Sequence, residues 1–179
     1  WVLKHSVAAL LKPLGYVRKK NSFLRELGEV QAIVDVTRGN FNTVENAGFT
    51  IEVGVFSPAL FHFFYNLPNP DPPLSRDCVI SSRLRQLADD HLDPWWTLTG
   101  SDDATTVDQA IAHDITDRQQ RHGLPFLNRF ATRDSILKFL EEPRSPGDRF
   151  IMPRAEPHRW CYVGILHALN GNRLKAISA

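Results

Sequence analysis

Long apolar segments are missing from this sequence of 179 residues: no run of about 18 apolar residues, the length that crosses a bilayer, occurs in it. No charged stretch followed by an apolar one, the mark of a signal peptide, is recognisable near the first residue. Cysteine is also scarce, because Cys78 and Cys161 are too few for a disulfide framework and too far apart for a Cys-x-x-Cys metal site. We therefore expect a cytoplasmic protein with two buried thiols and no membrane partner.

Common catalytic and phosphate-binding motifs are missing as well. The patterns GxGxxG, GxxxxGK[ST], HExxH and GxSxG do not occur. His158, Cys161 and His167 are the best candidates for metal ligands, but His167 follows Cys161 by about 600° of helical rotation and so points elsewhere. The sequence therefore predicts no metal, no cofactor and no catalytic residue.

Net charge is nearly absent, because 21 basic and 20 acidic residues leave a formal charge of +1. A dedicated nucleic-acid binder normally has a strongly basic face, so this balance argues against one. The charges are nevertheless separated along the chain: residues 1–25 hold six Lys or Arg and no acid, whereas residues 66–117 hold three bases and ten acids. The acidic middle is either a solvated surface or a surface that attracts a basic partner.

Apolar periodicity predicts the elements of the first hundred residues. Apolar residues at helical spacing from Leu3 to Leu14 predict a helix that Gly15 ends. Alternation of apolar and polar residues predicts strands over 17–26 (with a polar turn at 19–22), 30–37 and 49–56. Three segments follow: 59–65 fits a short helix or a loop edge, 66–73 with its four prolines is an irregular loop, and 77–88 fits a fourth strand or the start of a helix.

Helical patterns dominate the remaining residues. Ser101-Asp102-Asp103 offers a cap and two carboxylates at a helix N-terminus, and Gly123-Leu124-Pro125 predicts the end of that helix. Further helices are expected from Thr132 to Pro143 and over 157–169.

The order of helix, strands and helices predicts an α+β fold. We expect an antiparallel β-meander of three to five strands, with an N-terminal helix and C-terminal helices packed on one side. Residues 1–179 would form a single domain, in which 1–100 supply the first helix and the sheet. Residues 101–179 would supply the helical part, including a proline-rich loop at 141–157.

Charged residues on the predicted strands suggest two candidate sites. A basic group around the first hairpin includes Arg18 and Arg25, and is either an anion-binding patch or a solvated hairpin whose charges discourage edge pairing. With Arg83 they would line a basic pocket at the sheet edge. Asp35 and Glu52 lie on neighbouring strands, where they either face each other as paired carboxylates or are exposed or paired with a base.

Trp95 and Trp96, after Asp93 and Pro94, are the most distinctive local feature. On a strand, adjacent side chains point to opposite faces, so one indole can be buried while the other is exposed. The pair therefore provides either two core anchors or one residue of a recognition surface, where tryptophan is enriched.

Several stretches together resemble a bacterial family catalogued as a domain of unknown function. The stretches are Leu11-Lys12-Pro13-Leu14-Gly15-Tyr16, the basic turn Arg18-Lys19-Lys20 with Phe23 and Arg25, the strand Phe49–Val55, Arg83-Leu84-Arg85-Gln86-Leu87, and Asp93 with Trp95 and Trp96. The resemblance covers residues 1–100 and identifies no catalytic residue. Members resemble small cytoplasmic proteins encoded among toxin and immunity cassettes, which implies neutralisation of a partner protein.

Our leading hypothesis is a cytoplasmic protein-binding module, an immunity protein that neutralises a basic toxin domain through an acidic face. The residues assigned to that face are Asp89, Asp90, Asp93, Asp102 and Asp103, with Trp96 as an anchor. The alternative is an enzyme or small-anion-binding protein that uses the basic pocket of Arg18, Arg25 and Arg83. A deep cavity with converging basic groups favours the alternative, and a flat acidic face favours the first hypothesis.

Overall fold

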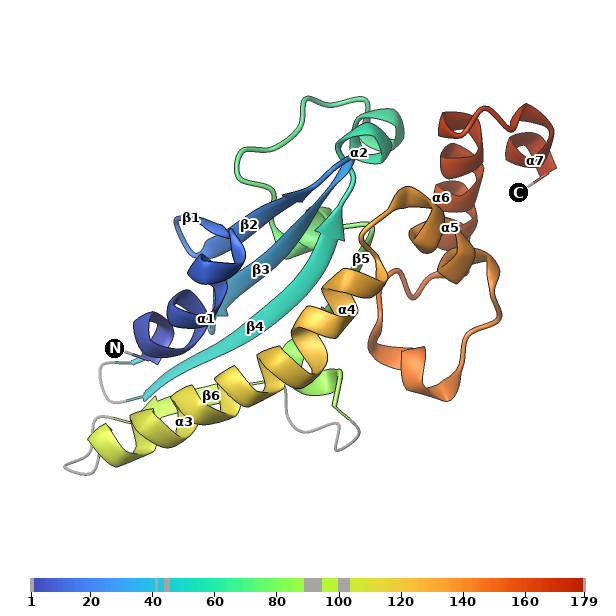
Figure 1. Ribbon diagram of the computed structural model, residues 1–179. Helices are drawn as coiled ribbons and strands as arrows, with labels where there is room; N and C mark the ends of the chain where they lie inside the picture. Colours follow the sequence, from blue (N-terminus) through green and yellow to red (C-terminus); the bar gives the residue numbers. More distant parts are fainter. Residues whose placement is uncertain (1, 41, 44–45, 89–94, 100–103, 179) are drawn as a thin grey trace.

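An antiparallel β-sheet flanked by helices forms the centre of the computed structural model (Figure 1), which describes residues 2–40, 42–43, 46–88, 95–99 and 104–178. The strands are β1 (Val17–Lys19), β2 (Ser22–Leu27), β3 (Val30–Arg38), β4 (Asn46–Phe56), β5 (Ile80–Arg83) and β6 (Trp96–Thr99). Five of them lie in the order β1-β2-β3-β4-β5, and β6 pairs with the first residues of β4. The predicted α+β fold and antiparallel meander are confirmed.

The N-terminal helical segment packs beside the sheet. It passes from a π-helical turn, Lys4–Ala8, through α1 (Ala9–Leu11) into a 3₁₀ turn, Lys12–Leu14. Gly15 ends it with φ at +85°, a left-handed conformation that glycine adopts without a steric penalty. The helix predicted from Leu3 to Leu14 is confirmed.

The remaining helices follow β4 and β6. They are α2 (Pro58–Tyr65), α3 (Ala104–Arg118), α4 (Leu124–Arg129), α5 (Arg133–Glu141), α6 (Glu156–Leu169) and α7 (Arg173–Ser178). The first of them confirms the short-helix alternative for 59–65, while 77–88 forms β5 followed by a 3₁₀ turn, Leu84–Gln86. The last of them, α7, was not among the expected helices. Among the described residues, no helix combines the length and apolar character needed to cross a bilayer.

The main core lies on one face of the sheet. Alternation along the two long central strands turns Val34 and Val53 to this face, where both are fully buried. Leu11 of the N-terminal segment, Ile115 of α3 and Phe130 after α4 belong to the same buried cluster. The helices that cover the sheet are therefore held by apolar burial, as the amphipathic patterns predict.

The opposite face carries a smaller core under residues 66–79, which we call the α2–β5 loop. Ile33 and Phe56 of the sheet pack there with Phe61 of α2 and with Cys78. Cys78 is a buried free thiol as expected, but Cys161 is exposed and the expectation that both are buried is wrong for it. The loop between α2 and β5 therefore covers a second sheet face.

The helix predicted to end at Gly123-Leu124-Pro125 continues, so this prediction is wrong. A π-helical turn, Gln119–Gly123, joins α3 to α4 without a break, and Figure 1 shows one long helix. Gly123 has helical angles, and a Cβ atom there would lie only 2.6 Å from Gln119 Oε1, so glycine serves close packing and not termination. The wider π turn precedes Pro125 and accommodates the proline ring near the preceding turn.

Candidate functional site

A row of polar side chains crosses the sheet on the face of the smaller core. Lys19, Ser22, Asp35, Glu52 and Arg83 are successive cross-strand neighbours on β1, β2, β3, β4 and β5. Directly paired residues project to the same face of a sheet, so the row has a cation at each end and two carboxylates in the middle. Of the two alternatives for Asp35 and Glu52, the structure shows both in part: the two carboxylates face each other, and Glu52 is also paired with a base, Arg83.

Ser75 joins the two carboxylates from above the sheet. Its Oγ donates toward Asp35 Oδ2, 3.3 Å away, and contacts Glu52 Oε2, while its backbone N–H donates to Asp35 Oδ2 at 3.3 Å. Ser22 Oγ donates to Asp35 Oδ1 at 2.9 Å. These bonds give a buried carboxylate the donors that it needs, and they fix the start of the 3₁₀ turn on the sheet.

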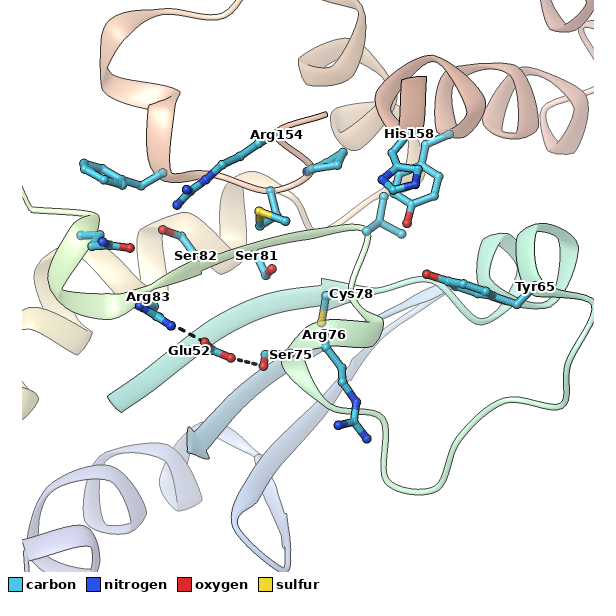
Figure 2. Close-up of a pocket in the computed structure, with 16 residues that line it drawn as sticks. Glu52, Tyr65, Ser75, Arg76, Cys78, Ser81, Ser82, Arg83, Arg154 and His158 are labelled. Carbon is cyan, nitrogen blue, oxygen red and sulfur yellow. Dashed lines mark hydrogen bonds and ion pairs between the residues drawn. The ribbon is translucent and has the colours of Figure 1, made fainter. Parts of the chain in front are cut away.

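A cavity of about 510 Å³ opens at the β5 end of this row (Figure 2). Its volume lies in the range of about 300–1,000 Å³ that is typical of small-molecule sites. Glu52, Ser75 and Cys78 lie on the sheet side. Arg154 and His158 lie on the other side, on α6 and the segment before it. The cavity therefore lies between the edge of the sheet and the C-terminal part of the chain.

An isolated β-bridge holds the far wall against the sheet. Met152 pairs antiparallel with Ser81, and the Met152 N–H donates to Ser81 O at 2.7 Å. Arg144 reinforces the same segment, because its guanidinium donates to the carbonyls of Asp148, Ile151 and Pro153. The position of Arg154 in the cavity therefore follows from backbone pairing at the sheet edge.

Positive charge exceeds negative charge in the cavity. Glu52 is its one carboxylate among the described lining residues, and Arg83 Nε already lies 3.4 Å from Glu52 Oε1. Arg154 forms no ion pair with a described residue and stacks near the ring of Phe150 at 5.8 Å. Arg76 also borders the cavity, but its side chain is 79% exposed and points away from the other arginines (Figure 2).

Hydroxyl groups complete the lining. Burial and the neighbouring Tyr65 raise the pKa of Tyr162, so its phenol remains a hydrogen-bond donor across the physiological range. Ser82 is 4% exposed, lines the cavity, and its Oγ has no hydrogen-bond partner among the described residues. A cavity with guanidinium groups and hydroxyl donors matches the oxygen atoms of an anion.

The three arginines predicted to share one basic pocket do not converge. Arg83 lines the cavity beside β5, whereas Arg25 borders a cavity under the α2–β5 loop, and Arg18 borders a third cavity that Leu3 and Lys4 also line. The prediction of a single pocket is wrong because Arg18 and Arg25 lie on β1 and β2, at the other side of the sheet from β5. Its location at a sheet edge is correct for Arg83.

Trp96 is not the exposed anchor that the sequence suggested. It is 4% exposed, stacks on Phe49 with ring centroids 5.8 Å apart, and donates from Nε1 to Asp114 Oδ2 at 2.8 Å. Trp96 is buried because it lies on the same sheet face as Phe49, its cross-strand neighbour, at the main core. Trp95 is partly exposed and lies under the guanidinium of Arg83 at 5.6 Å.

The acidic face stays a prediction, because Asp89, Asp90, Asp93, Asp102 and Asp103 lie outside the described residues. Other acids of the acidic middle segment are described, and several are paired within the chain. Asp71 pairs with Lys19 at 2.6 Å. Asp114 and Asp117 pair with Arg118 and Arg121 one helical turn later, at 2.7 Å and 2.8 Å. These three carboxylates already form ion pairs with bases of the same chain.

The far wall of the cavity is not predicted by the sequence. Arg154 lies in the segment predicted as a surface loop at 141–157, and the sequence pattern offers His158 only as a candidate metal ligand. Within the described ranges, no three His, Cys, Asp or Glu side chains form a metal-binding group. The strand alternative for residues 77–88, with Arg83 on it, is the one signal that points to the near wall, and no local pattern points to the wall across the cavity.

A known family model matches most of the chain. Residues 7–142 match the model of a family described as a domain of unknown function, DUF4304. The match includes the polar row and ends before residues 150–162, which supply the far wall of the cavity. Searches of curated proteins and of solved structures returned no match.

Proposed function

This chain belongs to the DUF4304 family, a domain of unknown function, and we propose that it binds a small organic anion in the cavity between β5 and α6. The observation that carries the proposal is the placement of Arg83 and Arg154 on two walls of one cavity of about 510 Å³. Guanidinium groups donate several hydrogen bonds in one plane and match carboxylate and phosphate groups.

Glu52 has a positioning role in this proposal. Its carboxylate holds Arg83 at 3.4 Å and is itself held by Ser75, so one guanidinium is oriented before a ligand arrives. A ligand anion would share Arg83 with Glu52 and take the exposed Arg154 as its second partner. Phe150 and Met152 provide an apolar wall for the organic part of the ligand.

Calorimetric titration with phenyl phosphate tests the proposal, with benzyl alcohol as the uncharged probe. We expect phenyl phosphate to bind and each of R83Q and R154Q to weaken binding about tenfold or more, because a hydrogen bond to a charged group contributes about 1.5–3 kcal/mol. R76Q is the matched control, since Arg76 borders the same cavity but points away from it. Equal effects of all three substitutions, or equal binding of both probes, would refute a specific anion site.

Protein binding is the second candidate function, and an exposed apolar surface supports it. Phe63 of α2 and Trp160 of α6 are 61% and 40% exposed and line one shallow groove. Exposed aromatic residues are frequent anchors of protein interfaces, so Trp160 replaces Trp96 as the candidate anchor. The toxin-neutralising role implied by the resemblance belongs to this second proposal.

Co-expression with the product of the neighbouring gene tests this second function. If an acidic face carries the interaction, association should slow as salt rises, because screening weakens charge steering. If the groove carries it, W160A should abolish the complex and salt should have little effect. A complex that survives both changes, or no complex at all, would contradict protein binding by these surfaces.

A further inference from the structure

A second cavity of about 520 Å³ lies at the end of the sheet where β4 begins and β6 pairs with it, and Leu3 and Lys4 of the N-terminal segment also line it. Its floor is apolar and includes Val36, Phe49 and Leu98, of which the first two are buried. The strands that supply this floor belong to the face of the main core. The cavity is therefore an open continuation of the main core at the end of the sheet.

Three cations border this floor: Lys4, Arg18 and Arg38. Among the described lining residues there is no Asp or Glu, and Lys4 and Arg38 form no ion pair with a described residue. Arg18 Nε donates to Lys20 O at 2.9 Å, which occupies one of its five N–H groups. The cavity thus carries positive charge that the described part of the chain does not neutralise.

Strand register places the cations next to the apolar floor. Arg38 is the direct cross-strand neighbour of Phe49, and Arg18 is the neighbour of Phe23, whose ring lies 5.8 Å from its guanidinium. Cross-strand neighbours share a face, so both guanidinium groups project from the face that buries the two aromatic rings. Charge and apolar surface are adjacent at one end of the sheet.

We propose that this second cavity binds an organic anion with an extended apolar body, such as a medium-chain carboxylate. The carboxylate would contact Arg38 and Lys4, and the hydrocarbon would cover Val36, Phe49 and Leu98. An inorganic anion would leave the apolar floor in contact with water, and an uncharged hydrocarbon would leave the cations without a partner. The site is distinct from the cavity beside β5, where hydroxyl groups and Arg154 form the lining.

Calorimetric titration with decanoate, inorganic phosphate and decyltrimethylammonium tests this proposal on the whole chain. We expect decanoate to bind and the other two probes not to bind, because only decanoate satisfies both the cations and the floor. R38Q and K4Q should each weaken decanoate binding about fivefold or more. K12Q is the matched control, because Lys12 is exposed and lies outside the cavity lining.

Two further variants show which of the two cavities holds decanoate. A47F fills the cavity from β4 and should abolish decanoate binding, whereas R154Q should leave it unchanged because Arg154 lines the other cavity. Circular dichroism confirms that each variant is folded. Binding of decyltrimethylammonium as tight as that of decanoate, or decanoate binding that R38Q and K4Q leave intact, overturns the proposal. Loss of decanoate binding in R154Q would assign the ligand to the first cavity and overturn it as well.

Anionic lipid vesicles distinguish a soluble ligand from a membrane surface. We expect phosphatidylglycerol vesicles not to sediment the protein, because Val36 and Phe49 of the apolar floor are buried inside the cavity, where a bilayer surface does not reach them. Sedimentation that R38Q abolishes, without binding of free decanoate, would contradict the soluble ligand that we propose.

Discussion

Replacement of Ser75 by alanine tests the polar row that holds the α2–β5 loop to the sheet. Ser75 is 6% exposed, and its Oγ contacts Glu52 Oε2 and lies 3.3 Å from Asp35 Oδ2. The hydroxyl has one hydrogen, so S75A removes one charge-assisted bond, while the backbone N–H of residue 75 keeps its bond to Asp35. A bond to a charged group contributes about 1.5–3 kcal/mol, and we expect that loss in the free energy of unfolding.

Urea denaturation followed by circular dichroism measures this loss, provided that the slope of the transition stays unchanged. Ser82 supplies a matched control, because it is equally buried but its Oγ has no partner among the described residues. S82A should change stability by less than about 0.5 kcal/mol or increase it, since no hydrogen bond is lost. Equal losses in S75A and S82A would show that the polar row does not stabilise the loop, and would refute the reasoning.

Further predictions concern the long helix and the thiols. G123A should change the free energy of unfolding by less than about 1 kcal/mol in a urea titration, because the new Cβ meets only the flexible end of the Gln119 side chain, whose amide has no hydrogen-bond partner among the described residues and can shift, while alanine favours a helix over glycine. A loss of more than about 2 kcal/mol that Q119A recovers would contradict this expectation. Burial, with the nearby carboxylates of Asp77, Asp35 and Glu52, raises the pKa of Cys78. At pH 8 a thiol reagent should therefore modify only the exposed Cys161 in the folded protein. The C161A variant should not react until it is unfolded. The pKa of Cys78 is higher in the folded than in the unfolded chain, so the protonated thiol stabilises the fold fully below about pH 9. The free energy of unfolding should therefore fall as the pH rises further, and this fall should be smaller in C78A.

The sequence predicted what depends on local periodicity. Alternation along β3 and β4 placed Asp35 and Glu52 on neighbouring strands, and the register pairs them directly. The helical repeat and Gly15 similarly predicted the N-terminal segment. These features follow from side-chain direction along a strand or helix, which the sequence contains explicitly.

What the sequence did not predict depends on contacts between distant residues. Ser75 meets Asp35 across 40 residues, and Arg154 reaches the cavity only because Met152 pairs with Ser81. Gly123 was interpreted as a helix end because glycine commonly occupies that position, but its role here is to make room for Gln119. Each of these features results from packing between residues that are distant in sequence or in side-chain contact, which local sequence patterns do not reveal.

The most direct test of anion binding in the cavity between β5 and α6 follows the arginine Nε–H signals by NMR during a titration with phenyl phosphate. We expect the signals of Arg83 and Arg154 to shift together and to saturate at one ligand concentration, while the signal of Arg76 stays in place. Unchanged signals of Arg83 and Arg154, or equal shifts of all three arginines, would contradict the proposed anion binding.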